Sequence, residues 1–439
     1  MRFRWLLLLV SAVLLTGVPF EVFAASETGI DSGDTAWMLV SAALVLLMTP
    51  GLAFFYGGLV RRKNILSVLM QCFMAMCMMT VLWVVIGYSL AFSDRNILWG
   101  IVGDFKYLFL NNVGFEAKGT IPHQLFMIFQ AKFAIITPAL IIGAFAERMK
   151  FKAYMIFSAL WLILVYCPIC HWVWGGSEGF FGLGADGALD FAGGTVVHVN
   201  AGIAALIAVL VVKKRQGFPE KISPPHNLPL AVLGAGLLWV GWFGFNAGSA
   251  LAANATGVNA FVVTHISSAM AGLTWVVLDY IANKRATLLG IITGAVAGLV
   301  AITPASGSVN AVGALYVGMG SSIVAFLAVT YLKPKFGYDD SLDVFGVHGM
   351  AGIWGSIAAG LWATSAVPGN DINGLFYGNA WQVVIQIKAV IYTIVWSGVM
   401  SYIILKIIDV TIGLRATEHN ERVGLDLTDH YETAYTFMD

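Results

Sequence analysis

The sequence predicts an all-α membrane protein with eleven transmembrane helices, formed by two five-helix units in inverted orientation and a long eleventh helix. Of its 439 residues, 59% are hydrophobic and only 11% are charged, against about 25% charged in a typical soluble domain. Apolar runs of roughly 20 residues, the length that spans a bilayer, recur along the chain. A short sequence pattern also recurs at a separation of 150 residues. Together these observations predict a polytopic membrane protein with an internal repeat.

Polar loops delimit the apolar runs and so define the predicted spans. Each run is long enough to cross the hydrocarbon core as a helix, and the last is long enough to tilt or to project beyond it. The predicted spans are residues 35–57, 66–92, 122–146, 152–173, 193–213, 228–248, 260–281, 287–303, 310–332, 344–364 and 380–410.

The basic residues predict the orientation of these spans. Most of them follow odd-numbered spans, whereas Arg95, Lys106 and Lys118 follow an even-numbered one. Because loops rich in lysine and arginine stay on the cytoplasmic side, we expect a multi-pass protein of the cell inner (plasma) membrane with its N-terminus outside and its C-terminus cytoplasmic. The clusters are Arg61–Lys63, Arg148 with Lys150 and Lys152, Lys213–Arg215 with Lys221, Lys284–Arg285, Lys333 with Lys335, and Lys406 with Arg415 and Arg422.

The first residues have the layout of a secretory signal peptide. Arg2 and Arg4 precede an apolar run, and Val22-Phe23-Ala24 offers small residues for cleavage. We expect residues 1–24 to be a signal peptide, 25–413 the transmembrane transporter domain and 414–439 a cytoplasmic C-terminal tail. An uncleaved first helix is the alternative. The formal net charge is zero and no basic block stands out, so no nucleic-acid partner is expected.

The repeat contains two histidines. Val197-His198-Val199-Asn200-Ala201-Gly202-Ile203 in the fifth span matches Val347-His348-Gly349-Met350-Ala351-Gly352-Ile353 in the tenth, with the pattern V-H-x-x-A-G-I. Five helices in each unit would insert in opposite orientations, which predicts an inverted repeat with a site at the interface of the halves.

Ionisable residues inside a bilayer are unfavourable, and they often serve function. His198 and His348 are therefore candidates for a transport role, with a hydrogen bond that merely joins two helices as the alternative. Two histidines on separate helices are also compatible with haem ligation, which a Soret band would reveal. For His265 a structural role is favoured.

Cys167-Pro168-Ile169-Cys170 has the spacing of a redox pair or half a zinc site. No second such pair completes a metal site, so we expect packing rather than chemistry from these cysteines, and neither a metal nor a cofactor.

Five stretches resemble the Amt/Mep/Rh ammonium transporter family, and its bacterial Amt branch in particular. In this order they form a highly specific combination that extends over nearly the whole chain after residue 24. They are Pro50-Gly51-Leu52-Ala53-Phe54-Phe55-Tyr56-Gly57-Gly58-Leu59, Gly143-Ala144-Phe145-Ala146-Glu147-Arg148, Asp190-Phe191-Ala192-Gly193-Gly194-Thr195-Val196-Val197-His198, Gly241-Trp242-Phe243-Gly244-Phe245-Asn246-Ala247-Gly248-Ser249 and Asp343-Val344-Phe345-Gly346-Val347-His348-Gly349.

The resemblance implies roles at the outer end of a pore. Trp174 and Ser249 would form the vestibule that recruits ammonium, with Phe133 at its base. Phe133 and Phe245 would be stacked rings that close the vestibule. Residues on the same helix as Phe133 that would lie nearby are Phe129 and Gln130.

The resemblance also implies roles deeper in the membrane. His198 and His348 would be the twin histidines of the pore, with Trp242 beside them, and Tyr56 would orient the second imidazole. Asp190 would be a buried acid near the recruitment site that supports conduction without binding the substrate directly. Its position also allows it to cap the helix that carries His198.

The resemblance implies a transporter rather than an enzyme, which carries ammonium or ammonia and also methylammonium. Its partners would be the lipid bilayer, two further copies in a homotrimer, and a PII-type signalling protein at the cytoplasmic tail. An ammonium sensor or regulator with low flux is the alternative. Lys132 departs from the family pattern because a small or apolar residue is expected beside Phe133. It either turns toward another helix or subunit or alters cation entry.

An apolar pore suits the separation of ammonium from potassium. The two ions are similar in size and charge, so a carbonyl-lined filter would separate them poorly. A bare cation is strongly disfavoured in an apolar passage, whereas neutral ammonia is not. Potassium has no proton to lose, so we expect recruitment of ammonium, loss of its proton, passage of ammonia, and transfer of the proton that involves the two histidines.

Overall fold

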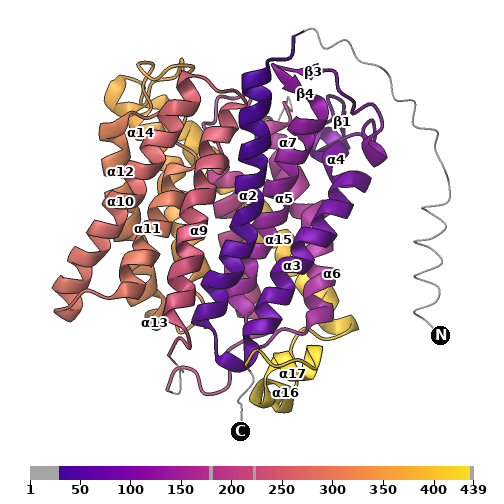
Figure 1. Cartoon of the computed structure of the whole chain (residues 1–439), viewed down its shortest axis with the longest axis vertical. Helices are drawn as coiled ribbons and strands as arrows, with labels where there is room; N and C mark the ends of the chain where they lie inside the picture. Colours follow the sequence, from indigo (N-terminus) through magenta and orange to yellow (C-terminus); the bar gives the residue numbers. More distant parts are fainter. Residues whose placement is uncertain (1–28, 177–180, 221–223, 436–439) are drawn as a thin grey trace.

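Helices run roughly side by side along the long axis of the molecule (Figure 1). The computed structural model describes residues 29–176, 181–220 and 224–435, so the expected signal peptide, residues 1–24, lies outside the described residues. In the part of the chain that is described, nine helical segments are long and apolar enough to cross a membrane. The shorter α11 and the segment formed by η9 and α14 complete the eleven spans, which confirms the predicted fold class.

The first five spans begin and end within a few residues of their predicted bounds. Three of them contain a π-helical turn, a wider turn that often marks functional segments. They are α2 (Ser32–Leu59); α3 (Ile65–Leu82), η2 (Trp83–Gly87) and α4 (Tyr88–Phe92); α5 (His123–Phe145); α6 (Phe151–Trp161), η5 (Leu162–Tyr166) and α7 (Cys167–Trp174); and η6 (Gly194–Val199) with α8 (Asn200–Val212).

The remaining six spans begin and end within five residues of their predicted bounds. They are α9 (Leu228–Ala247); α10 (Ala255–Asn283); α11 (Leu288–Ile302); α12 (Ala311–Leu327), η8 (Ala328–Leu332) and α13 (Lys333–Phe336); η9 (Phe345–Met350) with α14 (Ala351–Trp362); and α15 (Trp381–Thr411). Short 3₁₀ turns lie between the long helices: η1 (Arg62–Asn64), η3 (Leu98–Gly100), η4 (Leu108–Leu110), η7 (Gly248–Ala250) and η10 (Leu375–Tyr377).

Two small hairpins cover one end of the molecule between α4 and α5. In one, β1 (Asn96–Ile97) pairs antiparallel with β2 (Val102–Gly103), and in the other β3 (Ala117–Lys118) pairs with β4 (Ile121–Pro122). In Figure 1 they lie at the end where α2 begins.

Small residues allow α10, α11 and α12 to pack closely. A methyl group added at Gly298 of α11 would lie 2.6 Å from the Ser267 carbonyl oxygen of α10, and one at Gly318 of α12 would lie 2.3 Å from the same oxygen. The Ser267 hydroxyl in turn donates to the Gly298 carbonyl at 3.0 Å. Such small-residue contacts drive helix association in membranes, where the hydrophobic effect between helices is lost.

The two repeat helices cross at equivalent glycines. A methyl group at Gly202 would lie 2.2 Å from Cα of Gly349, and one at Gly352 would lie 3.0 Å from Cβ of His198 and 3.1 Å from the Val199 nitrogen. Gly202 thus approaches Gly349, and Gly352 approaches Val199. Adding 150 to Gly202 and subtracting 150 from Gly349 converts the first contact into the second. This reciprocal contact indicates pseudo-twofold symmetry at the crossing.

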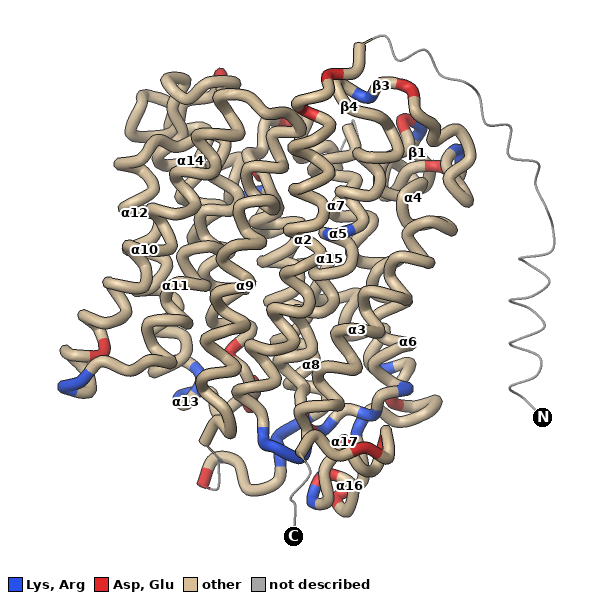
Figure 2. The backbone as a smooth tube through the Cα atoms, viewed as in Figure 1, with Lys and Arg blue, Asp and Glu red and all other residues tan. Residues whose placement is uncertain are grey.

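Most charged residues lie at the two ends of the bundle, and basic residues gather at the end opposite the hairpins (Figure 2). There the buried Glu147 carboxylate lies 3.0 Å from Arg61 and 3.2 Å from Arg215, and Arg215 also pairs with Asp339 at 2.7 Å. Burial alone would raise the pKa of Glu147, but the two arginines outweigh it and hold that pKa below its usual value. This ion cluster joins four loops that are far apart in sequence.

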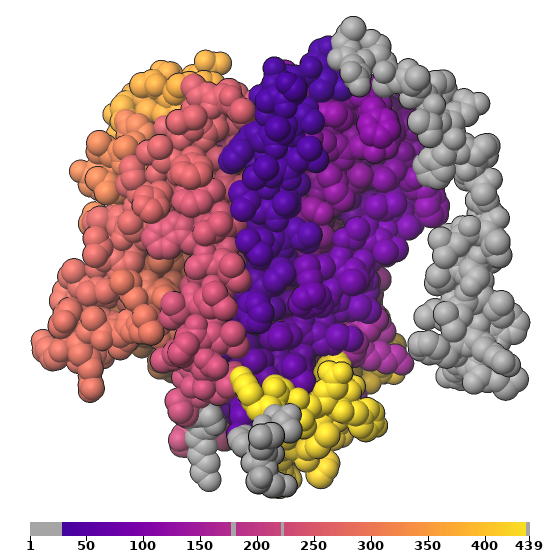
Figure 3. Space-filling model, viewed as in Figure 1, coloured from indigo at the N-terminus to yellow at the C-terminus, as the bar shows by residue number. Residues whose placement is uncertain are grey.

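The C-terminal tail folds back over this basic end (Figure 3). It forms two short helices, α16 (Glu418–Val423) and α17 (Leu425–His430), and α17 supplies two carboxylates that cap membrane helices. Asp426 accepts from the Ser67 amide at the start of α3 at 2.7 Å, and Asp429 accepts from the Phe151 amide at the start of α6 at 3.1 Å. Because unpaired amides at a helix start are stabilised by such acceptors, the tail is part of the folded structure.

Candidate functional site

His198 and His348 meet in the centre of the molecule. Their Nδ1 atoms lie 3.3 Å apart, and their rings are nearly parallel with centroids separated by 5.4 Å. Both side chains are buried, and the Nε2 atom of His198 has no partner among the described residues. One Nδ1 must donate and the other accept across this contact, so the pair shares one hydrogen and holds its imidazoles in a fixed relation.

Asp190 positions His198 through the start of its helix. The Asp190 carboxylate accepts from the amides of Gly193, Thr195 and Val196 at 3.0 to 3.1 Å, and also from the Gly194 amide and the Thr195 hydroxyl. Gly193 has φ of 116°, a conformation that side chains rarely adopt. The carboxylate therefore fixes the first turn of η6 and confirms the capping position predicted from the sequence.

Asp340 occupies the equivalent place before His348. It was not identified as a candidate site residue from the sequence. It lies 150 residues after Asp190, and its Oδ2 accepts from the Phe345 amide at 2.8 Å, which corresponds to the Thr195 amide of the first half. Asp343, the counterpart of Gly193, also has a left-handed backbone with φ of 58°. The signal was present in the sequence, because extending the V-H-x-x-A-G-I match backward by eight residues aligns the two aspartates.

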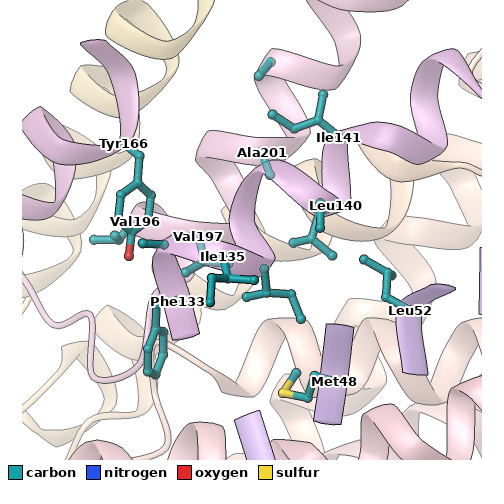
Figure 4. Packing of buried hydrophobic residues seen from close by; sticks show 14 of the residues in the cluster. Met48, Leu52, Phe133, Ile135, Leu140, Ile141, Tyr166, Val196, Val197 and Ala201 are labelled. Carbon is teal, nitrogen blue, oxygen red and sulfur yellow. The ribbon is translucent and has the colours of Figure 1, made fainter. Parts of the chain in front are cut away.

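The two histidines face a narrow cavity with an otherwise apolar wall. His198 and His348 line it together with the indole of Trp242. Figure 4 shows Met48, Leu52, Leu140 and Val197 among the packed side chains of this region. The other residues of the wall are Phe55, Ile136, Leu238, Phe245 and Val296. An uncharged solute suits this lining, whereas a bare cation does not.

A cluster of aromatic rings lies beside the histidines. Phe133 and Phe245 approach with centroids 4.4 Å apart, and Phe129 meets Phe133 edge-on at 5.0 Å. Trp174 meets Phe133 edge-on, with ring centroids 5.6 Å apart, and the Phe245 ring lies 6.0 Å from that of His198. Both Phe133 and Phe245 are fully buried, whereas Trp174 is partly exposed. The structure thus brings together Trp174, the two phenylalanines and the histidines in that spatial order.

Other residues expected at the site hold defined positions. Trp242 stacks on His198 at 5.5 Å and donates its indole hydrogen to the hydroxyl of Thr303, a partner that no sequence pattern indicated. The Ser249 hydroxyl donates to the Phe245 carbonyl at 2.8 Å. Gln130 is buried, and its side-chain oxygen is unpartnered within the described residues.

Tyr56 donates its hydroxyl to the Leu140 carbonyl at 3.0 Å. Its ring packs near Gly143 and Val344, because a methyl group at Gly143 would lie 2.8 Å from the tyrosine ring and 2.7 Å from the valine. Orientation of His348 by Tyr56 stays a prediction.

Comparison with known proteins supports the resemblance in the sequence. A family model described as the Ammonium Transporter Family matches residues 36–435. An ammonium transporter of Bacillus subtilis is 48% identical over 406 residues, which cover 92% of this chain and 98% of the relative.

Solved structures agree with this match. The crystal structure of Candida albicans Mep2 has a TM-score of 0.85 at 34% identity and covers 91% of this chain and 90% of its own. A structure titled Sensor Amt Protein has a TM-score of 0.83 at 28% identity, covering 91% and 98%. From a match that extends over nearly the whole chain, we conclude that this multi-pass membrane protein belongs to the ammonium transporter family.

Proposed function

We propose that the protein transports ammonium by separating it into ammonia and a proton at the paired histidines. The observation that carries this proposal is the Nδ1 contact between His198 and His348 in an otherwise apolar cavity. Within the described part of the chain, Nε2 of His198 has no hydrogen-bond partner. A lone-pair nitrogen in such a wall gives a proton acceptor where a cation is otherwise disfavoured.

Entry begins at Trp174 and Ser249. The partly exposed indole of Trp174 offers a ring face that attracts a cation, and its Nε1 is already engaged by the Asp190 carbonyl at 2.8 Å. The rings of Phe133 and Phe245 then close the path, so their side chains must move for the substrate to pass. Phe129 packs edge-on against Phe133 of this gate, and Gln130 lies beside Phe129 on the same helix, α5.

Proton loss follows as ammonium leaves water. One N–H bond of ammonium breaks, its electron pair stays on nitrogen, and the proton passes to Nε2 of His198. Loss of hydration favours this step because it destabilises the charged form of an amine. Ammonia continues through the apolar cavity, while the Nδ1 contact conducts the proton from His198 to His348. Trp242 holds the His198 ring by stacking, and its own position is fixed by Thr303.

Asp340 is the proposed proton acceptor on the inner side. Burial raises the pKa of Asp340 to about 6, despite the opposing charge of Lys333. Its Oδ1 atom is buried and has no hydrogen-bond partner among the described residues, so the carboxylate retains a free acceptor. A carboxyl group with a pKa near neutral can take up and release a proton at physiological pH.

The setting we propose is the inner membrane, with the N-terminus outside and the basic end cytoplasmic. The gathering of basic loops at one end supports this orientation. The tail folded over that end offers a surface for a PII-type regulator, and the family resemblance supports a homotrimer. Methylammonium is the second expected substrate.

Uptake into proteoliposomes tests the function. An ammonium gradient across vesicles of the full chain should give a saturable pH change in the lumen that an equal potassium gradient does not produce. A rate no higher than that of protein-free vesicles would favour the alternative, a low-flux sensor, to which the likeness to the Sensor Amt Protein points.

A further inference from the structure

Thr303 is a buried hydroxyl that binds the indole of Trp242. The Trp242 Nε1 hydrogen is donated to Oγ1 of Thr303 at 2.8 Å, and the Thr303 hydroxyl donates to the Leu299 carbonyl at 2.8 Å. Because a hydroxyl has a single hydrogen, and this one is directed at Leu299, its oxygen acts toward the indole as an acceptor. The two bonds form a chain with one direction, from the indole through the hydroxyl to the backbone of α11.

The segment that contains Thr303 is held against the helix that carries His198. Thr303 follows directly after α11 and is fully buried. The carbonyl of the next residue, Pro304, accepts from the Phe191 amide at 3.1 Å. A methyl group added at Gly194, the first residue of η6, would lie 2.5 Å from the Pro304 ring. Thr303 is therefore fixed in place relative to both partners of the stacked pair of rings, Trp242 and His198.

This arrangement keeps the indole N–H away from His198. The Trp242 and His198 rings are nearly parallel, with an angle of 17° between their planes. An indole N–H lies in the plane of its ring, so in this arrangement it cannot donate to the stacked imidazole. Among the described residues that line the cavity, the indole is present but Thr303 is not, so the N–H points behind the wall. The Nε2 atom of His198 is left without a partner within the described residues.

The position of this N–H decides whether water can stay in the cavity. The cavity has a volume of about 10 Å³, close to the smallest space that holds one water molecule, and a buried water typically makes about three hydrogen bonds. In the described lining, side-chain nitrogen and oxygen atoms belong only to His198, His348 and Trp242. With the N–H bound by Thr303, two imidazoles remain as partners. A freed N–H would supply the third, or would itself turn to Nε2.

We propose that Thr303 is a positioning residue that keeps the cavity dry and leaves Nε2 of His198 open to ammonium, by accepting the indole N–H of Trp242. The proposal rests on the proposed function of the paired histidines and adds a residue that determines what they meet. A water molecule or an indole bound at Nε2 would occupy the nitrogen that has to accept the proton of ammonium.

Two substitutions of Thr303 test this role in proteoliposomes of the full chain. Thr303→Val replaces the hydroxyl by a methyl group, and Thr303→Ser, which keeps the hydroxyl, is the matched control. Orphaning the N–H should lower the maximum ammonium current of Thr303→Val about tenfold. The half-saturating ammonium concentration should not change, since Trp174 and Ser249 are left intact. Light scattering after an osmotic shock should show faster water flow through Thr303→Val, whereas Thr303→Ser should match the parent protein in both measurements.

Removal of the donor itself separates this role from general support of the fold. Trp242→Phe keeps a ring beside His198 but has no N–H. In that background, adding Thr303→Val should change the current and the water flow by less than about twofold, because the two changes remove partners of the same bond. The double variant has no N–H to orphan, so it provides the comparison even if Thr303→Val alone fails to fold.

Three results would overturn the proposal. They are a Thr303→Val protein with the current and water flow of the parent, a loss of current without faster water flow, and an equal loss in the parent and Trp242→Phe backgrounds. The water measurement is independent of ammonium. A parent protein without ammonium current would therefore refute the proposed function, while the water flow of Thr303→Val would still decide the role of Thr303.

Discussion

The two aspartates at equivalent places in the repeat hold their helices in different ways. Asp190 receives four backbone amides and the Thr195 hydroxyl, so both of its oxygens are occupied. Asp340 receives the Phe345 amide on one oxygen, while its other oxygen is buried without a hydrogen-bond partner in the described part of the chain. Both halves retain the backbone turn and the hydrogen bond from the equivalent amide, Thr195 or Phe345, but Asp190 accepts more hydrogen bonds than Asp340.

This difference separates a structural role from a chemical one. An acid whose oxygens are saturated by fixed donors serves to hold the helix start, and its loss leaves several donors without an acceptor. An acid with one free oxygen and a pKa of about 6 can exchange a proton without unfolding its helix. The two halves share a fold but serve different steps. Asp190 lies in the half that recruits ammonium, and Asp340 lies in the half that releases the proton.

The largest effect is expected at Asp190. Asp190→Ala removes the acceptor of the η6 amides and should lower the free energy of unfolding by about 3 kcal/mol or more, since each orphaned buried group is unfavourable by about 1 to 3 kcal/mol. Thermal unfolding in detergent measures this, and ammonium flux should be lost as the His198 helix shifts. A variant as stable as the parent would show that the cap is dispensable.

A smaller effect is expected at the crossing of the repeat helices. Gly202→Ala places a methyl group 2.2 Å from Cα of Gly349. Because this neighbour is a backbone atom, relief of the clash requires a shift of the helix, and we expect the free energy of unfolding to fall by about 2 kcal/mol. Gly352→Ala meets its nearest atom at 3.0 Å and should be milder. Gly236→Ala, with nothing within 4 Å, is the control and should be neutral or stabilising. Equal effects at all three positions would contradict the close reciprocal crossing.

The smallest effect on stability is expected at Asp340. Asn at this position still offers an oxygen to the Phe345 amide, so Asp340→Asn should change the free energy of unfolding by less than about 1 kcal/mol. Its effect should instead be on pH dependence. Below its pKa of about 6 the carboxyl group is already protonated and cannot accept another proton, so proton transfer should slow as the pH on the inner side falls through that value.

Proteoliposome currents recorded at a series of lumenal pH values measure this dependence, with the pH on the other side held constant. The parent protein should lose current as the lumen is acidified through pH 6, and Asp340→Asn should give a low current without this step. An unchanged pH profile in the variant would remove Asp340 from the proton path.

Most of the membrane architecture could be predicted from sequence because hydropathy and helix length are local properties. The apolar run at 122–146 became α5, His123–Phe145, and the long run at 380–410 became α15, Trp381–Thr411. The repeated V-H-x-x-A-G-I motif also correctly indicated that the fifth and tenth spans meet. These predictions depend on spacing along the chain, which the bilayer converts directly into structure.

Other features depend on contacts between distant segments and could not be predicted in this way. The bond from Trp242 to Thr303 joins α9 to the residue after α11, and the tail carboxylate of Asp426 caps a helix 359 residues earlier. Nothing in the local pattern of either partner indicates the other. Asp340 is an intermediate case. Its spacing before His348 can be read from the sequence, but only the structure shows that its Oδ1 has no hydrogen-bond partner among the described residues.

The most direct test of proton separation at the twin histidines is the current in proteoliposomes after an ammonium pulse, compared with that of a variant carrying both His198→Leu and His348→Leu. The same vesicles are then given a potassium pulse, and methylammonium serves as a second substrate. We predict that the parent protein carries an ammonium-dependent current and excludes potassium, and that the variant loses this current or admits potassium. An unchanged and still selective ammonium current in the variant would contradict the account.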